Sequence, residues 1–266
     1  GLYLLGFVFL IWFHIQIYNT VLIEYPGFLR QFIPVENSRF LVPLWIESEK
    51  LYFWAMIASF FVSTMPQKKD VVSFLGLIMA VFSTAVYFFS NPFKDPLPIV
   101  HSEITGWYAA SGDGSIFQMA GTLYGRITFY YNSTYMWTHP PMLFIAYASL
   151  IITAAACVYM LIRSDRIYDE IAYRYAKFGY ILLTIGMLIG YPWAIEAWKE
   201  SAWWWDPKIS GSIMMWVLYT AYLHARIYAG RMWKATASFG IICFASLVFT
   251  YLLTYIVPGI HSVVQP

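Results

Sequence analysis

Long apolar segments separated by short polar ones dominate the chain, and no stretch shows the strict alternation of a half-buried strand. A helix needs about 20 mostly apolar residues to cross the hydrocarbon layer of a bilayer. Seven segments come close to this length: 2–23, 44–64, 71–90, 140–162, 175–195, 211–229 and 236–257. The pattern therefore predicts an all-α polytopic membrane protein with about seven transmembrane helices, forming a single membrane domain over residues 1–266.

The connections between these segments differ in length and charge. The short connections 65–70, 163–174 and 226–235, together with Lys177 just inside the next helix, contain nine of the 16 basic residues. They contain only four of the 14 acidic residues. Positively charged loops favour the cytoplasm, so these connections and the N-terminus are expected there. The opposite, outer face then receives the C-terminus and the segments 24–43, 91–139 and 196–210. We expect the protein to lie in a plasma or inner membrane, or in the organellar equivalent.

The composition supports a membrane protein and excludes several other classes. Hydrophobic residues make up 60% of the chain and charged residues 11%, against about a quarter charged in soluble domains. Two Cys residues are too few for a disulfide scaffold, and a net charge of +2 gives no reason to expect nucleic acid as a partner. The lipid bilayer is the partner that this composition predicts. The 12 Trp, 22 Tyr and 21 Phe exceed what a membrane requires, and many fall in the outer loops.

Two of the five histidines are expected at the same depth on the outer face. His139 precedes Pro140 and Pro141, which favour the first positions of a helix, and His261 follows the last span. Two neutral imidazoles at one depth can supply both axial ligands of a haem iron. The alternative is that each imidazole bonds to a loop carbonyl.

Two other histidines are expected inside the membrane, where a polar residue is costly and indicates a functional site. His224 follows Asp206 by 18 residues, which is about 27 Å along one helix. His224 and His14 are therefore candidates for a second, intramembrane haem site. The alternatives are that His224 reaches the cytoplasmic interface and that His14 bonds to a neighbouring helix. His101 is expected to be a solvated or structural loop residue.

The segment 193–208 contains a cluster of five tryptophans: Trp193, Trp198, Trp203, Trp204 and Trp205. An interfacial aromatic belt spreads its Trp residues over many helix ends instead of gathering them in one loop. Clustered indoles suit a large planar ligand such as a porphyrin. Asp206 followed by Pro207 is the pattern of a helix N-cap, and Asp206 is expected to have that role. The outer loops 91–139 and 196–210 are thus predicted to form a haem-binding face.

The segment from Trp193 to Lys208 resembles the tryptophan-rich WWD signature of the haem-handling CcmF/CcsA/CcmC proteins of cytochrome c biogenesis. Ser90–Phe93 and Thr138–Leu143 resemble stretches of CcmF. The sequences of Glu196–Trp198 and His261–Ser262 are closer to those of CcsA. The chain is most similar to a short or split CcmF, although the later region that carries a second intramembrane histidine in CcmF is absent. Trp45–Glu49 also departs from the family pattern, and its acidic residues, Glu47 and Glu49, are expected to be solvated.

The resemblance implies roles for particular residues. His139 and His261 would be the ligands of an outer b-type haem iron, and the five tryptophans with Asp206 would form the surface beneath it. His224 would bind the iron of an inner haem, with His14 or another subunit as the second ligand. The remaining alternative is that the inner haem is missing.

The function that this implies is a subunit of a cytochrome c haem lyase, which presents haem on the outer face for thioether attachment to apocytochrome c. Other cytochrome c maturation subunits would be its partners. No residue is an obvious catalytic acid or base for thioether formation; Asp206 is the nearest candidate, and capping is its preferred role. Two other functions fit the same residues: an electron-transfer subunit that carries haem b in a larger respiratory complex, and a haem exporter or chaperone of the CcmC type.

Overall fold

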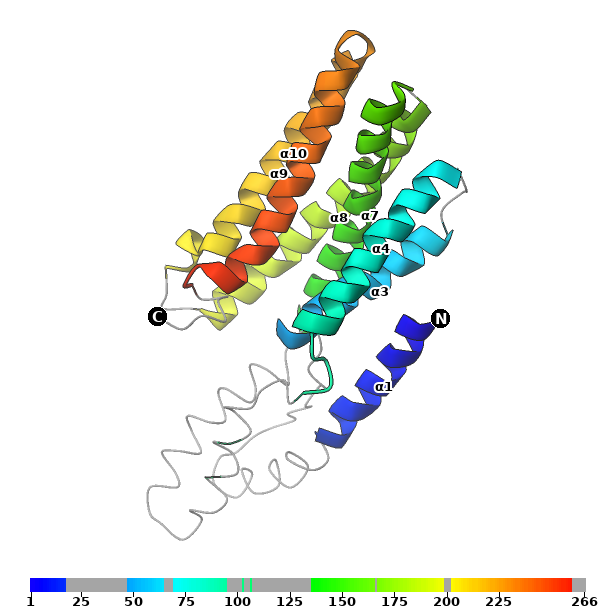
Figure 1. The fold of residues 1–266 in the computed structure, drawn as a ribbon. Helices are drawn as coiled ribbons and strands as arrows, with labels where there is room; N and C mark the ends of the chain where they lie inside the picture. Colours follow the sequence, from blue (N-terminus) through cyan, green and yellow to red (C-terminus); the bar gives the residue numbers. More distant parts are fainter. Residues whose placement is uncertain are drawn as a thin grey trace. The chain divides into compact units, whose positions relative to one another are not determined.

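The computed structural model describes residues 1–17, 47–64, 69–94, 102, 106, 135–165, 167–198 and 202–259. Its elements are α1 (Leu2–Ile17), α3 (Glu47–Thr64), α4 (Lys69–Phe89), α7 (Tyr135–Arg163), α8 (Ile167–Ala197), the 3-10 turn η2 (Trp203–Trp205), α9 (Pro207–Ala225), the 3-10 turn η3 (Arg226–Tyr228) and α10 (Ala229–Ile256) (Figure 1). The described residues contain no strand. Each of the seven predicted spans corresponds to one α-helix of the described residues, so the all-α class is confirmed.

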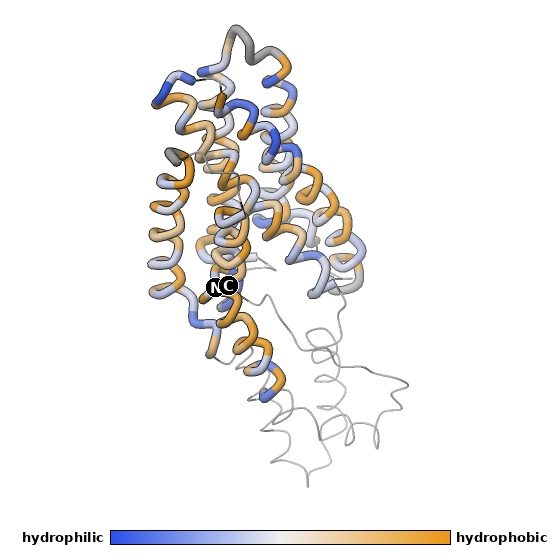
Figure 2. Tube along the Cα trace, turned by 90° about the vertical axis from the view of Figure 1, so that its right-hand side faces the viewer, coloured by the Kyte–Doolittle hydropathy of each residue, from blue (hydrophilic) through white to orange (hydrophobic). Residues whose placement is uncertain are grey.

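Four of these helices are long and apolar enough to cross a membrane by themselves: Val71–Phe89, Trp137–Arg163, Ile167–Ile195 and Met232–Ile256. Leu2–Gln16 is a shorter apolar helix. Apolar residues follow one another along most of these helices, and strongly polar residues lie mainly near helix ends (Figure 2). This distribution is that of a polytopic membrane protein.

Four helices of the described residues begin at least four residues before their apolar segments: α7, α8, α9 and α10. α7 starts at Tyr135, so Pro140 and Pro141 lie inside the helix. The sequence had predicted them at its first positions. α8 starts at Ile167, eight residues before the predicted start. Hydropathy marks only the part of a helix that suits lipid, whereas hydrogen bonding continues the helix into the interface.

The turn between α7 and α8 contains three residues and explains why α8 can begin so early. Ser164 has a positive φ of 53°, the left-handed conformation that commonly ends a helix. The Asp165 carboxylate then accepts a hydrogen bond of 2.9 Å from the Ile167 backbone N–H. This bond satisfies one of the first N–H groups of α8, which have no partner within the helix.

The chain divides into two compact units, residues 1–52 with 87–137 and residues 53–86 with 138–266. In the second unit, Trp54 of α3 is almost fully buried, with 3% of its surface exposed. Its ring contacts Phe82 of α4, Tyr147 of α7 and Tyr251 of α10, at centroid distances of 4.9, 5.7 and 5.2 Å. One indole therefore joins four helices of this unit. The single-domain expectation stays a prediction.

Polar side chains join α8 to α9 in the middle of the second unit. The hydroxyls of Tyr180 and Thr220 are 2.8 Å apart, and the Trp216 indole N–H donates to the Thr184 hydroxyl at 2.9 Å. The Tyr180 and Trp216 rings also stack, with an interplanar angle of 21°. Hydrogen bonds between helices satisfy polar groups that lipid cannot, so these contacts fix the two helices against each other.

Replacing Tyr219 by Phe is expected to stabilise the second unit by about 1 kcal/mol. Tyr219 is fully buried in α9, and its hydroxyl has no hydrogen-bond partner among the described residues. Removing the hydroxyl therefore removes a desolvation cost without breaking a bond. Thermal unfolding in detergent micelles would measure the change, and Tyr180→Phe, which does lose a bond, is the control. A lower unfolding temperature for Tyr219→Phe would contradict this interpretation.

Candidate functional site

His139 is half-buried in α7, and a hydrogen bond to α8 orients its ring. Its Nδ1 lies 2.7 Å from the backbone carbonyl oxygen of Gly186. A carbonyl can only accept, so the proton of the neutral imidazole lies on Nδ1 and the lone pair on Nε2. Metal-bound histidines show this arrangement, in which a backbone carbonyl holds one ring nitrogen and the other is the ligand.

Gly190, one turn beyond Gly186, lets the His139 ring lie against the backbone of α8. A Cβ atom at position 190 would lie 2.6 Å from His139 Cε1 and 2.8 Å from Nδ1, closer than nonbonded atoms approach. The two glycines form a small-xxx-small pattern, which allows helices to pack closely in membranes. On the same helix, the Trp193 ring lies 5.9 Å from the imidazole at an angle of 35°.

The five clustered tryptophans contribute two ring pairs rather than one continuous plane. Trp193 and Trp198 meet edge to face, with centroids 5.0 Å apart, next to His139. Trp203 and Trp204 of η2 stack at 3.8 Å and 23°, and Tyr191 packs against both. The fifth, Trp205, is 83% exposed. The pair that contains Trp193 is the one in contact with His139.

Asp206 caps α9, as the sequence predicts. Its Oδ1 accepts hydrogen bonds from the backbone N–H groups of Lys208 at 3.0 Å and Ile209 at 3.4 Å, and Pro207 occupies the first helical position. The side chain is nearly buried, with 5% exposed. This cap fixes the point at which the Trp-containing turn η2 joins α9.

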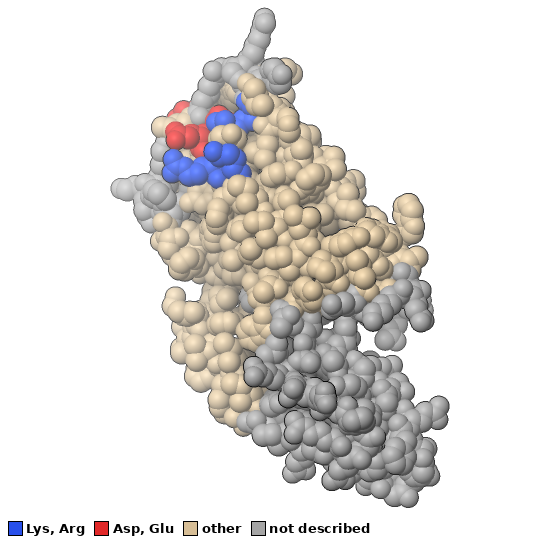
Figure 3. Space-filling model, turned by 180° about the vertical axis from the view of Figure 1, so that it is seen from behind, with Lys and Arg blue, Asp and Glu red and all other residues tan. Residues whose placement is uncertain are grey.

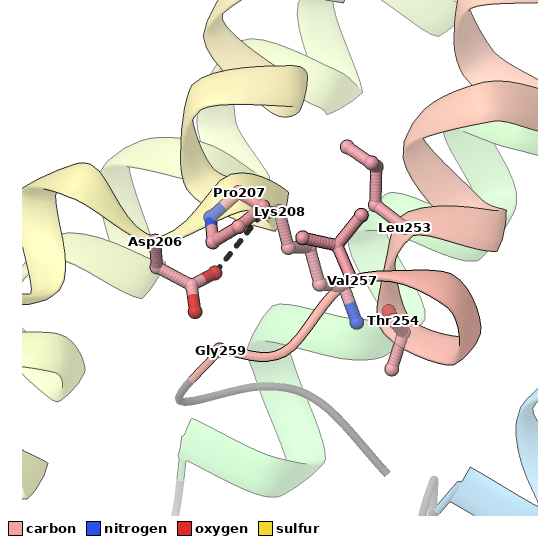
Figure 4. Close-up of a pocket in the computed structure, with 7 residues that line it drawn as sticks. All are labelled: Asp206, Pro207, Lys208, Leu253, Thr254, Val257 and Gly259. Carbon is pink, nitrogen blue, oxygen red and sulfur yellow. Dashed lines mark hydrogen bonds between the residues drawn. The ribbon is translucent and has the colours of Figure 1, made fainter. Parts of the chain in front are cut away.

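The end of α10 approaches this cap. A small recess lies between the two (Figure 4). One side is lined by Asp206, Pro207 and Lys208, and the other by residues at and just after the end of α10, Leu253, Thr254, Val257 and Gly259. A Cβ atom at Gly259 would lie 2.6 Å from Asp206 Oδ2, so only a glycine permits this approach. His261, two residues later, lies outside the described residues, as does His101. The pairing of His139 with His261 stays a prediction.

Replacing Asp206 by Ala is expected to lower the free energy of unfolding by about 1 kcal/mol, because two backbone N–H groups of α9 lose their acceptor. Asp206→Asn keeps an oxygen acceptor and should lose much less. Circular dichroism during thermal unfolding in micelles would compare the two variants. Equal unfolding temperatures for Asp206→Ala and the unmodified protein would rule out the capping role.

His224 and His14 lie in different units. His224 is exposed in the last turn of α9, where its Nδ1 donates to the carbonyl of Thr220 at 2.8 Å. α9 runs unbroken from Asp206 to this turn, as predicted. His14 of α1 is buried, with 1% exposed, and its Nε2 bonds to the Glu49 carboxylate of α3. The use of either residue as a ligand of an inner haem stays a prediction.

The expectation that Glu49 is solvated is wrong: its side chain is fully buried. The sequence places it in an acidic stretch at a helix start, which normally faces water. The His14 imidazole supplies a hydrogen-bond partner, which makes burial of this polar side chain tolerable. The sequence interpretation also missed Gly186 and Gly190, although their spacing of four residues is a recognisable signal.

A family comparison assigns most of the chain. Residues 44–261 match the model of the family described as "Cytochrome C assembly protein". Curated relatives include the cytochrome c biogenesis protein CcsA of Gloeobacter violaceus, with 40% identity over 95 residues, and CcsA of Cyanophora paradoxa, with 39% identity over 103 residues.

These two alignments cover 35% and 38% of this chain, and 28% and 32% of the relatives, so the chain matches about three tenths of their length. No solved structure matches. Both relatives are CcsA proteins, and the greater similarity to CcmF stays a prediction. Because the family model covers far more than half of the sequence, the chain belongs to the cytochrome c assembly protein family.

Proposed function

We propose that this protein holds haem at its outer face and presents it for attachment to apocytochrome c, as a membrane subunit of the cytochrome c maturation machinery. One observation carries the proposal: the bond from His139 Nδ1 to the Gly186 carbonyl leaves the lone pair on Nε2, the nitrogen that would coordinate iron. Family membership supplies the context of cytochrome c assembly.

The donor set fits a haem group. A neutral imidazole is a common axial ligand, and the indole beside it offers an apolar face that suits a porphyrin. His139 would bind the iron, Trp193 and Trp198 would exclude water from one side, and His261 is proposed as the second ligand. Bound haem would supply the iron and the vinyl groups to which apocytochrome thiols add.

The residues of this chain have positioning roles in the proposal. The carbonyl of Gly186 holds the imidazole in one tautomer and one orientation. Asp206 caps the start of α9 and thereby fixes the turn that directly precedes it, which contains the Trp203–Trp204 pair. Asp206 already accepts two backbone hydrogen bonds, so we assign it to capping and not to acid–base chemistry.

Haem titration of the purified full chain tests the proposal. The unmodified protein should give the absorption spectrum of a six-coordinate bis-histidine haem, and His139→Ala and His261→Ala should each lose that spectrum. His101→Ala is the control, since it removes an imidazole that is expected to be a solvated or structural loop residue. An unchanged spectrum and affinity in His139→Ala would refute the role of this residue.

Co-purification would separate the proposed role from the two rival functions. Apocytochrome and thiol-reducing proteins are the expected partners. Stable association with oxidoreductase subunits would identify an electron-transfer role, and association with a haem chaperone would identify an exporter.

A further inference from the structure

On the face of the second unit that Figure 3 shows, Lys and Arg lie beside Asp and Glu at the end where α7 joins α8 and α9 joins α10. The Arg226 guanidinium makes two hydrogen bonds to Asp169, of 3.2 and 2.8 Å. Arg174 bonds to Glu170 at 3.2 Å. Both of these carboxylates are therefore already matched by a guanidinium.

Lys177 differs from these two arginines. Its ammonium is exposed and lies 4.3 Å from the centre of the Tyr173 ring, a cation–π contact, and no described carboxylate lies within ion-pair distance of it. The same ring also contacts the Arg226 guanidinium, at 3.7 Å. Tyr173 thus holds two cations at one level of the bundle, and only one of them has an anionic partner.

The depth of Lys177 matches the boundary of the hydrocarbon layer. The segment of α8 from 178 to 197 contains 20 residues and is about 30 Å long, which is the thickness of that layer. α9 agrees, because its 19 residues span about 28 Å before Arg226. If the outer ends of both helices lie at one interface, Lys177 and Arg226 lie at the other, at the level of lipid phosphates.

The surface below Lys177 suits acyl chains. Ile181, Ile185 and Leu188 follow Lys177 by four, eight and eleven residues, so they share one face of α8. Their side chains are 57%, 36% and 67% exposed. Arg174 precedes Lys177 by one turn on the same face. An exposed apolar stripe therefore ends at two neighbouring cations.

We propose that Lys177, with Arg174 beside it, binds the phosphate of an anionic phospholipid whose acyl chains lie along Ile181, Ile185 and Leu188. The preference for an anionic lipid follows from charge, since Lys177 has no carboxylate partner in the described chain. A zwitterionic lipid would bring its own ammonium next to the lysine. This site is independent of the haem-binding proposal.

Native mass spectrometry of the full chain, titrated with phosphatidylglycerol or phosphatidylcholine in micelles, tests the site. We expect preferential binding of phosphatidylglycerol, about fivefold weaker in Lys177→Gln and retained in Lys177→Arg. Lys94→Gln, which removes one exposed lysine charge from the other unit, is the control and should bind like the unmodified protein.

Three results would overturn the proposal. Equal binding of the two lipids would exclude a site for anionic headgroups. An equal loss in Lys94→Gln and Lys177→Gln would show an effect of net charge alone. If millimolar inorganic phosphate displaced phosphatidylglycerol from the site at Lys177, the site would bind the free phosphate ion, and the acyl chains would contribute nothing to binding.

Discussion

Glu49→Ala is expected to destabilise the first unit by about 3–5 kcal/mol, the largest effect of any single substitution proposed for this protein. Both Glu49 and His14 are buried, and removing the carboxylate leaves the imidazole without the partner of its Nε2. Removing one partner of a buried hydrogen-bonded pair costs far more than the pair contributes, because the remaining polar group stays desolvated. Chemical or thermal unfolding in micelles would measure the loss.

The double variant His14→Leu/Glu49→Leu distinguishes this cause from a simple loss of packing. Replacing both partners by apolar residues of similar size leaves no uncompensated polar group, so most of the stability should return. Glu170→Ala is the control, since its ion pair with Arg174 is exposed and should contribute at most about 0.5 kcal/mol. If Glu49→Ala and Glu170→Ala unfold at the same temperature, the buried pair does not exist.

Gly190→Ala is expected to weaken haem binding by about 10- to 100-fold, the range found when the second partner of a metal-bound histidine is lost. The new Cβ atom would meet the His139 ring at 2.6 Å, so the ring must rotate or move away from α8 and lose its bond to the Gly186 carbonyl. This expectation depends on the proposed haem site. Absorbance titration with haem would measure the change in affinity.

Gly76→Ala provides the matched control for that substitution. Gly76 lies within α4, and nothing approaches within 4 Å of the position that its Cβ would take. The same chemical change should there stabilise the helix slightly and leave haem binding unchanged. Equal haem affinities for Gly190→Ala and Gly76→Ala would show that the glycine at 190 has no role in orienting His139.

Periodicity and length were sufficient to find the helices but not their ends. Every long apolar segment became an α-helix, because a segment of that length in lipid must satisfy its own backbone hydrogen bonds. The extra turns at the start of α8 lie outside its apolar segment, where the turn at Ser164 and capping by Asp165 decide the boundary. These are local interactions that hydropathy does not detect.

The candidate site was predictable where local sequence determines it. Asp206 followed by Pro207 encodes a cap, and the structure shows that cap. The tertiary partners of His139 and His14 were not predictable, because Gly186 and Glu49 are 47 and 35 residues away from them. Only the packing of the helices brings these residues together.

The polar contacts between α8 and α9 have a mechanical consequence for the region around the tryptophans. Tyr180 with Thr220, and Trp216 with Thr184, make two cross-links one turn apart, so sliding either helix by a single turn would break both inside the bilayer. The two helices must therefore move as one rigid body. Gly186, which orients His139, and the Trp203–Trp204 pair at the start of α9 are thus carried by one common frame.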